Sequence, residues 1–121
     1  MKEYRWAVSE RELAVSIGYL GPCVLGDNWY EGMSEPDENG RIRPTGAVLG
    51  GHCILCSGYD AKKELYRLHN SWGPKWGKGG DCFISAKDMA TLLKRRGEAA
   101  VPLKRQAVSY THLTLPTIYS V

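Results

Sequence analysis

The chain has 121 residues, which suits one small domain, and its hydrophobic (43%) and charged (24%) fractions are those of an ordinary globular protein. Its formal net charge is +3 with both signs interspersed, so it has no long basic run that would track a nucleic-acid backbone. No apolar stretch approaches the roughly 18 residues that span a bilayer, and the first residues lack the apolar segment of a secretory signal. We therefore expect neither a nucleic-acid nor a membrane partner, and nothing in the residues indicates a cellular location.

A helix, a short strand and a long loop are predicted in the first part of the chain. Ser9 and Glu12 have the spacing of a capping box, and apolar residues follow at helical spacing, which predicts a helix over about 10–19. A Gly-Pro pair ends it, and the short apolar run over 23–26 predicts a core strand. The stretch 28–45 is rich in Gly, Pro, Asp and Asn, so we expect a loop that is either functional or mobile.

The second part of the chain predicts an antiparallel hairpin, a further strand and a second helix. A long strand is predicted over 47–59 and a return strand over 64–69, with a turn at 60–63 between them. Because so short a turn keeps the strand ends close, the two strands should pair antiparallel. After a glycine-studded loop, 81–84 predicts another strand, and a second capping arrangement opens a helix over 85–96.

The chain has four cysteines, Cys23, Cys53, Cys56 and Cys82, which we expect to be free thiols. Cys53 and Cys56 have the two-residue gap of a metal or redox pair. They lie, however, in a run that is typical of a buried strand, where positions three apart point to opposite faces. We therefore expect small buried side chains here, and neither a metal nor a cofactor.

The last residues, 108–121, are expected to be foreign to the protein. The run Val-Ser-Tyr-Thr-His-Leu-Thr-Leu-Pro-Thr over 108–117 has no clear period and no Asp, Glu, Lys or Arg. One of its back-translations matches the transposon-end adapter used in sequencing libraries. We therefore expect a domain over 1–107 and an adapter-derived tail over 108–121.

The strongest motif is Asn-Ser-Trp-Gly-Pro-Lys-Trp-Gly-Lys-Gly-Gly over 70–80. With ordinary residue usage, its fixed positions match by chance with a probability on the order of one in a billion. Gly50, Gly51 and His52 open a strand upstream of it. Together these residues resemble the C-terminal half of the papain-like cysteine peptidases, over roughly 9–97.

The resemblance implies an α+β fold, in which an antiparallel sheet is half-wrapped into a barrel with helices at its edges. It also implies that the N-terminal helical subdomain is missing, since that half normally packs against this one with the active site between them. We therefore expect one exposed apolar face and only marginal stability for the chain alone.

The same resemblance implies roles for three residues. His52 would stabilise the thiolate of a cysteine, whose unperturbed pKa is near 8.5, and would then protonate the leaving amine. Asn70 would orient the imidazole through its amide oxygen without adding charge, and Trp72 would cover that hydrogen bond. Three further residues are candidates for substrate binding: Gly26, Gly51 and Cys53.

Other aromatic and histidine side chains near the motif are less specific. Trp29 and Tyr30 either line a substrate cleft or cap the core, and Trp76 is expected to pack rather than react. His69 adjoins Asn70 on an extended segment, so their side chains should diverge, and we expect His69 to be structural or to face solvent.

The nucleophile that the family requires is missing. None of the four cysteines is followed by the expected tryptophan, and counting back from His52 puts the nucleophile before Met1. Cys56 shares a strand face with His52, but four residues of strand separate their backbones by about 13 Å. Two functions remain open: a fragment of a cysteine-type peptidase that acts on peptides or proteins through a thioester and is inactive alone, or a non-catalytic papain-fold binding or structural module.

Overall fold

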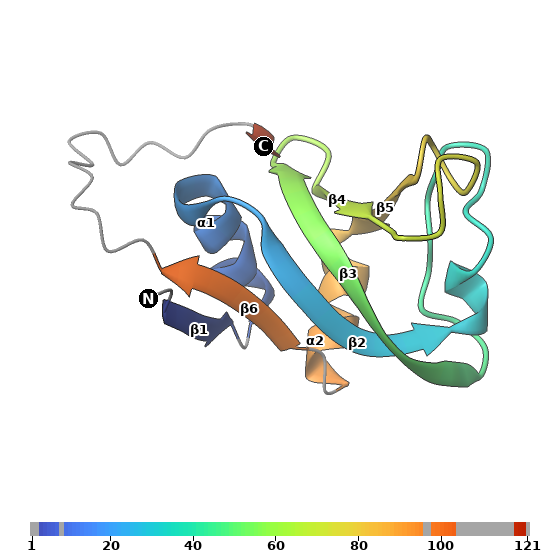
Figure 1. The fold of residues 1–121 in the computed structure, drawn as a ribbon, viewed down its shortest axis with the longest axis horizontal. Helices are drawn as coiled ribbons and strands as arrows, with labels where there is room; N and C mark the ends of the chain where they lie inside the picture. The colour runs from blue at the N-terminus through green and yellow to red at the C-terminus, as the bar shows by residue number, and fades with distance from the viewer. Residues whose placement is uncertain (1–2, 8, 96–97, 104–117, 121) are drawn as a thin grey trace.

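The structure is a computed structural model that describes residues 3–7, 9–95, 98–103 and 118–120. The chain is α+β, as predicted, with two α-helices and an antiparallel sheet (Figure 1). The helices are α1 (Glu10–Leu20) and α2 (Ala86–Lys94), and a 3-10 turn, η1, covers Glu31–Met33. The strands are β1 (Glu3–Ala7), β2 (Cys23–Tyr30), β3 (Val48–Asp60), β4 (Leu65–His69), β5 (Asp81–Ser85), β6 (Glu98–Leu103) and β7 (Ile118–Ser120).

Both helices begin where the sequence predicts. The backbone N–H of Glu12 donates to the Ser9 hydroxyl at 3.1 Å, and that hydroxyl donates to the Glu12 carboxylate at 3.3 Å. Ser85 caps α2 in the same way by accepting from Asp88 N at 3.0 Å. Gly21, at φ 94°, ends α1. The second helix was predicted to reach residue 96, but α2 ends at Lys94, where Arg95 leaves the helical conformation and its N–H bonds Thr91 O.

The sheet has the order β1-β6-β2-β3-β4-β5, and every ladder is antiparallel. The predicted hairpin is confirmed as β3 and β4, with Tyr59 opposite Tyr66. β7 pairs with the far end of β3, opposite Gly58–Asp60. The rest of the tail expected over 108–121 lies outside the described residues.

The predicted second strand was too short. β2 continues from Cys23 to Tyr30, so residues 28–30 belong to the sheet rather than to the loop. β2 is paired with β3 from Cys23 to Tyr30, so it is extended over its whole length. Every second side chain therefore points inward, at residues 23, 25, 27 and 29. The strand therefore carries Asp27 and Trp29 into the interior beside β3.

One face of the sheet makes the core with both helices. The inward side chains of β2–β5 pack against the buried side chains of α1 and α2; these core residues are Leu13, Ile17, Cys23, Leu25, Ile54, Cys56, Tyr66, Leu68, Cys82, Ile84, Met89, Leu92 and Leu93. The opposite, outer face has no covering helix among the described residues. No described helix is long and apolar enough to cross a membrane.

Candidate functional site

His52 and Asn70 meet at the start of β3. His52 Nε2 lies 2.9 Å from Asn70 Oδ1, although 18 residues separate them in the chain. The backbone N–H of Ser71 donates to the same Oδ1 at 2.8 Å, which identifies that atom as the acceptor. His52 Nε2 must therefore carry the proton. In this tautomer Nδ1 keeps its lone pair, and no described residue hydrogen-bonds to it.

The glycine-rich loop after β4 holds Asn70 in place. Asn70 is 2% exposed, and its backbone N–H donates to Gly80 O at 2.9 Å. Gly77 has φ 59°, and a Cβ there would lie 2.3 Å from the Asp81 carbonyl oxygen. Only glycine fits this close turn, which explains the Trp-Gly pair of the motif in physical terms.

Two indoles flank the imidazole, and a third packs against them. The ring centroids of Trp29 and Trp72 lie 4.6 and 5.1 Å from that of His52, and the Trp76 ring lies 5.3 Å from Trp72. Trp29 and Trp76 are both tied to Ser34, by hydrogen bonds to its hydroxyl at 3.1 Å and to its carbonyl at 2.8 Å. Trp72, in contrast, is 47% exposed, so it covers only part of the hydrogen-bonded pair.

Asp27 is a site neighbour that the sequence interpretation missed. It lies directly opposite His52 in the β2–β3 ladder, so both side chains point to the same face. It is 6% exposed, and neither carboxylate oxygen has a hydrogen-bond partner in the described part of the chain. Burial raises the pKa of Asp27 to about 7. The signal was available as an acidic residue in phase with the inward positions of β2.

The four cysteines are free thiols in two different environments. Cys23, Cys56 and Cys82 are buried, whereas Cys53 is exposed. Burial raises the pKa of Cys56 well above its usual value, with a further contribution from the neighbouring Cys23. Burial also raises the pKa of Cys82, to about 12. The predicted opposite orientation of Cys53 and Cys56 is confirmed, but the expectation that both are buried is wrong for Cys53, because its side chain lies on the outer face of the sheet. None of these thiols hydrogen-bonds to His52.

This difference predicts selective alkylation. Iodoacetamide should modify Cys53 in the folded chain, while Cys23, Cys56 and Cys82 react on the order of 100-fold more slowly, because they need an opening of the structure. Peptide mass spectrometry over time measures each site, and all four should react alike in urea. Equal rates in the folded chain would contradict the buried assignment.

The candidate substrate residues lie on the outer face of β2 and β3. Gly26 is opposite Cys53 in the ladder, and Gly51 is exposed two residues before it. A Cβ added at either glycine would meet no atom within 4 Å. Cys53 and Asn70 line one shallow hollow of about 300 Å³, and neither glycine is among its lining residues.

His69 points away from Asn70, as predicted. Its side chain is 54% exposed, and Nδ1 lies 2.7 Å from Asp81 Oδ1 on the outer face. No group of three or more His, Cys, Asp or Glu among residues 3–7, 9–95, 98–103 and 118–120 is arranged to hold a metal ion.

Two solved structures of proteases have a similar fold to this chain. The chain resembles xylellain, a cysteine protease from Xylella fastidiosa, with a TM-score of 0.67 and 24% identity over 84% of this chain and 40% of that one. The digestive procathepsin L2 proteinase of Tenebrio molitor gives a TM-score of 0.52 and 20% identity over 84% of this chain and 33% of that one. The chain has part of the papain-like cysteine protease fold.

Sequence comparison is weaker. No family model matches the chain. A curated protein of Dictyostelium discoideum, named Gamete and mating-type specific protein A, is 27% identical over 92 residues. The chain spans about a fifth of the length of that protein, and 33 to 40% of the two solved proteases. These comparisons therefore show a papain-like fold for this chain and leave its chemistry as a separate question.

Proposed function

We propose that this chain supplies the histidine and asparagine of a cysteine-type peptidase, whose nucleophile belongs to a helical subdomain outside these residues. The observation that carries the proposal is the hydrogen bond of 2.9 Å between His52 Nε2 and the buried Asn70 Oδ1, which leaves His52 Nδ1 available. The solved proteins that share the fold are cysteine proteases, which supports the same reaction class.

In this reaction His52 handles the proton at each step. The imidazole takes the thiol proton at Nδ1, and the thiolate attacks the carbonyl carbon of the peptide bond. The imidazolium returns that proton to the leaving amine as the C–N bond breaks, which leaves a thioester. His52 then takes a proton from water, the hydroxide attacks the thioester, and the thiol leaves with the proton restored.

Asn70 keeps the ring in the orientation that these transfers need. Its oxygen is fixed by Ser71 N at 2.8 Å, and its side chain is 2% exposed, so the hydrogen bond to His52 faces little competition from water. An amide accepts this bond in both protonation states of the ring, because Nε2 carries hydrogen in both.

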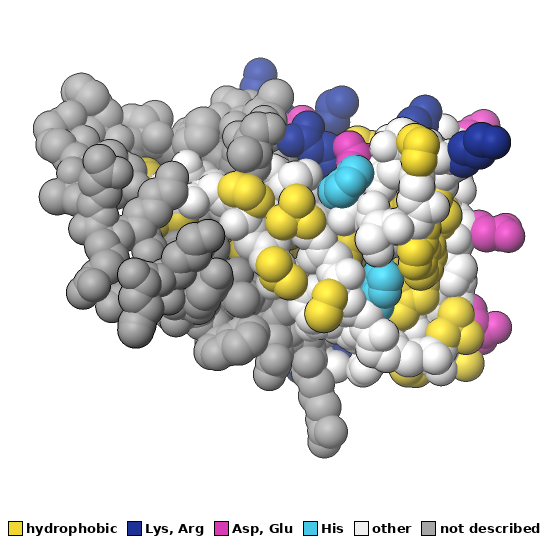
Figure 2. Space-filling model, viewed as in Figure 1, with side chains coloured by type: hydrophobic (Ala, Val, Ile, Leu, Met, Phe, Trp, Pro, Cys, Tyr) yellow, Lys and Arg dark blue, Asp and Glu magenta, His cyan; other side chains and the backbone are white. Residues whose placement is uncertain are grey.

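The missing subdomain would cover the exposed apolar residues near the site. Several large apolar side chains are at least 37% exposed: Val24, Val48, Leu49, Leu55 and Trp72. Figure 2 shows apolar side chains gathered around the histidines on the face turned to the viewer. Water contact with such a surface is unfavourable, and a helical subdomain packed there would bury it and bring a thiol to His52.

The test is to sequence the native locus on both sides and express the complete reading frame. We expect a glutamine and then a Cys-Trp pair roughly 130 residues before His52, and no adapter-derived codons after residue 107. The complete protein should cleave a fluorogenic peptide, an alkylating reagent should abolish the cleavage, and residues 1–121 alone should show none.

Each outcome separates the two functions. An upstream frame that has the helical subdomain but no cysteine at this place would support a non-catalytic module instead. Thiol-dependent cleavage by residues 1–121 alone would contradict the assignment of the nucleophile to another part of the protein. Native codons for 108–121 in their genomic context would refute the adapter hypothesis and leave the peptidase proposal intact.

A further inference from the structure

A hollow of about 540 Å³ lies over the far half of β3–β5, away from His52. Its lining residues include three cations, Arg41, Lys63 and Arg67, and two apolar side chains, Leu65 and Phe83. We propose that this hollow binds a small organic phosphate, with the phosphate held by the cations and the apolar body of the ligand on Leu65 and Phe83.

The lining charges are unbalanced in favour of an anion. Asp60 is the only carboxylate among the described lining residues, and its Oδ1 already accepts from the backbone N–H groups of Lys62 and Lys63 at 3.0 and 3.1 Å. In the described part of the chain, no carboxylate lies within 4 Å of the charged nitrogens of Arg41, Lys63 or Arg67. The Asp37 carboxylate, outside the lining, does interact with Arg41: its pKa is lowered by the backbone N–H of Arg41 and, to a smaller extent, by the Arg41 and Arg43 charges. The described lining still has three cations and one carboxylate, so an anionic ligand would find a favourable potential there.

Arg41 presents a donor that lacks an acceptor. Its Nε is buried and has no hydrogen-bond partner among the described residues. A buried N–H without an acceptor is unfavourable, and a phosphate oxygen is a strong acceptor that guanidinium groups bind in a two-point geometry. Rotation of the Arg41 side chain toward the hollow would bring this Nε to a ligand oxygen.

The side chain of Arg67 and the backbone of Arg41 are held in place before any ligand arrives. Asp37 Oδ1 accepts from the backbone N–H of Arg41 at 2.9 Å, and Ile42 N donates to Phe83 O at 2.9 Å, so the segment around Arg41 is fastened to β5. Arg67 Nε donates to Ser57 Oγ at 3.0 Å, which leaves its two terminal nitrogens for other acceptors. Binding would therefore need to order the side chains of Arg41 and Lys63, while Arg67 is already oriented, which favours affinity at that position.

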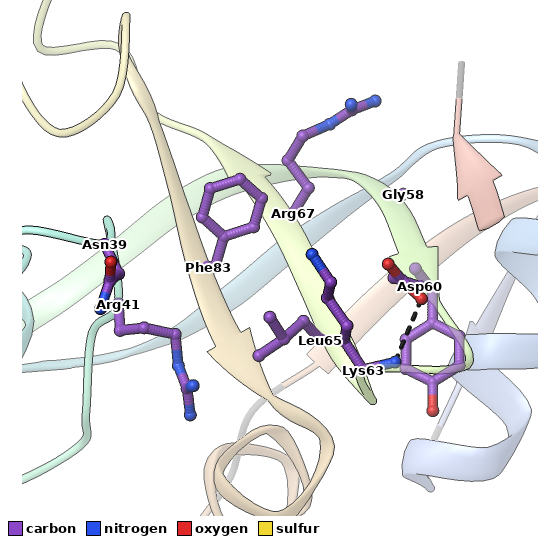
Figure 3. A pocket seen from close by; sticks show the side chains of 9 residues that line it. Asn39, Arg41, Gly58, Asp60, Lys63, Leu65, Arg67 and Phe83 are labelled. Atoms are coloured by element: carbon purple, nitrogen blue, oxygen red, sulfur yellow. Dashed lines mark hydrogen bonds between the residues drawn. The ribbon is translucent and has the colours of Figure 1, made fainter.

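The apolar side chains in the hollow favour a ligand that has an apolar part as well as a phosphate group. Figure 3 shows Leu65 and Phe83 between Arg41 on one side and Lys63 on the other. Phe83 is opposite Arg67, and Leu65 is opposite Asp60, so their side chains share the outer face of the sheet. An aromatic or aliphatic body would lie against them, and the volume suits a small-molecule ligand.

This hollow is separate from the histidine site. Asp60 is eight residues beyond His52 on the same strand, a distance of about 26 Å along β3. The proposal consequently does not depend on peptidase activity, and His52 is not among the residues that line this hollow.

Phenyl phosphate, inorganic phosphate and phenol are the probes for the test. Each is titrated into residues 1–121 at low salt while backbone amide signals are followed by NMR. Phenyl phosphate should bind with a Kd of about 1 mM, shift the amide signals of Leu65, Arg67 and Phe83, and bind at least tenfold more tightly than either other probe. No shift at these residues up to 20 mM, or equal binding of phenol, would overturn the proposal, as would equal binding of inorganic phosphate.

Variants tie the binding to the three cations. Lys63→Gln removes an exposed side chain that the fold does not need, and Arg41→Gln and Arg67→Gln remove the two guanidinium groups. Each should weaken phenyl phosphate binding about fivefold or more, and Arg67→Lys should recover only part of the loss, because it restores charge without the two-point geometry. Lys87→Gln, an exposed residue of α2 outside the hollow, is the matched control. Unchanged affinity in the Lys63 and Arg41 variants would refute the site.

Discussion

Replacing Asp27 with asparagine should make the chain more stable at neutral pH and leave its stability nearly unchanged at pH 4. Burial raises the pKa of Asp27 from 3.8 to about 7, so the folded state holds a proton that the unfolded state has already released between these values. The protonated Asp27 therefore makes its full contribution to the free energy of unfolding below about pH 4, and this contribution is lost as the pH rises through 7. The shift corresponds to roughly 4 kcal/mol in the free energy of unfolding, because each pKa unit is about 1.4 kcal/mol.

Urea unfolding followed by circular dichroism at several values between pH 4 and pH 8 measures the effect. Asparagine imitates the protonated acid in shape, so the two proteins should agree at the acid end and separate by several kcal/mol at the alkaline end. Glu38→Gln, at an exposed position of the loop before β3, is the control and should give a curve parallel to the original. A parallel curve for Asp27→Asn would mean that water or an unrecognised partner reaches the Asp27 carboxylate.

In the complete protein, His52→Gln should reduce kcat/KM for a peptide substrate by roughly 100- to 10,000-fold, the range that general acid–base groups contribute. Asn70→Ala should cost less, about 10- to 100-fold, since it removes one hydrogen bond to a group that becomes charged. Steady-state kinetics of the two variants gives this ranking directly.

His69→Gln is the matched control for these substitutions. This second histidine pairs with Asp81 on the outer face and has no contact with the His52 ring in the structure, so its loss should change kcat/KM by less than about threefold. The proposal would fail if His52→Gln kept normal activity while the enzyme still depended on a thiol. It would also fail if His69→Gln had the larger effect.

Local rules predicted the helices and the hairpin because their determinants lie within a few residues. The capping serines at 9 and 85 fix both helix starts, and the turn between β3 and β4 is too short for anything but an antiparallel pair. The length of β2, in contrast, is determined by its pairing with β3, which is distant in the sequence. Residues 28–30 look like loop residues, and they are extended because β3 pairs with them.

In the candidate site, His52 and Asn70 were predicted, whereas the neighbours that strand register brings to them were not. The motif around Asn70 and the glycines before His52 carry the resemblance to papain-like peptidases, and that resemblance implied the pairing of these two residues. Asp27 and Trp29 were missed as neighbours of His52, because their positions depend on the register of β2 against β3. The β1–β6 pair was also missed, since both of its partners are short and lie at opposite ends of the chain.

The clustering of Trp29, Trp72 and Trp76 gives the molecule a built-in optical probe. Three of its four tryptophans lie within about one ring diameter of one another and beside a titratable imidazole. Their combined ultraviolet emission therefore reports mainly on one small region. Trp72 is the member that water reaches most easily, so docking of another polypeptide over it should shift the emission to shorter wavelength without any added label.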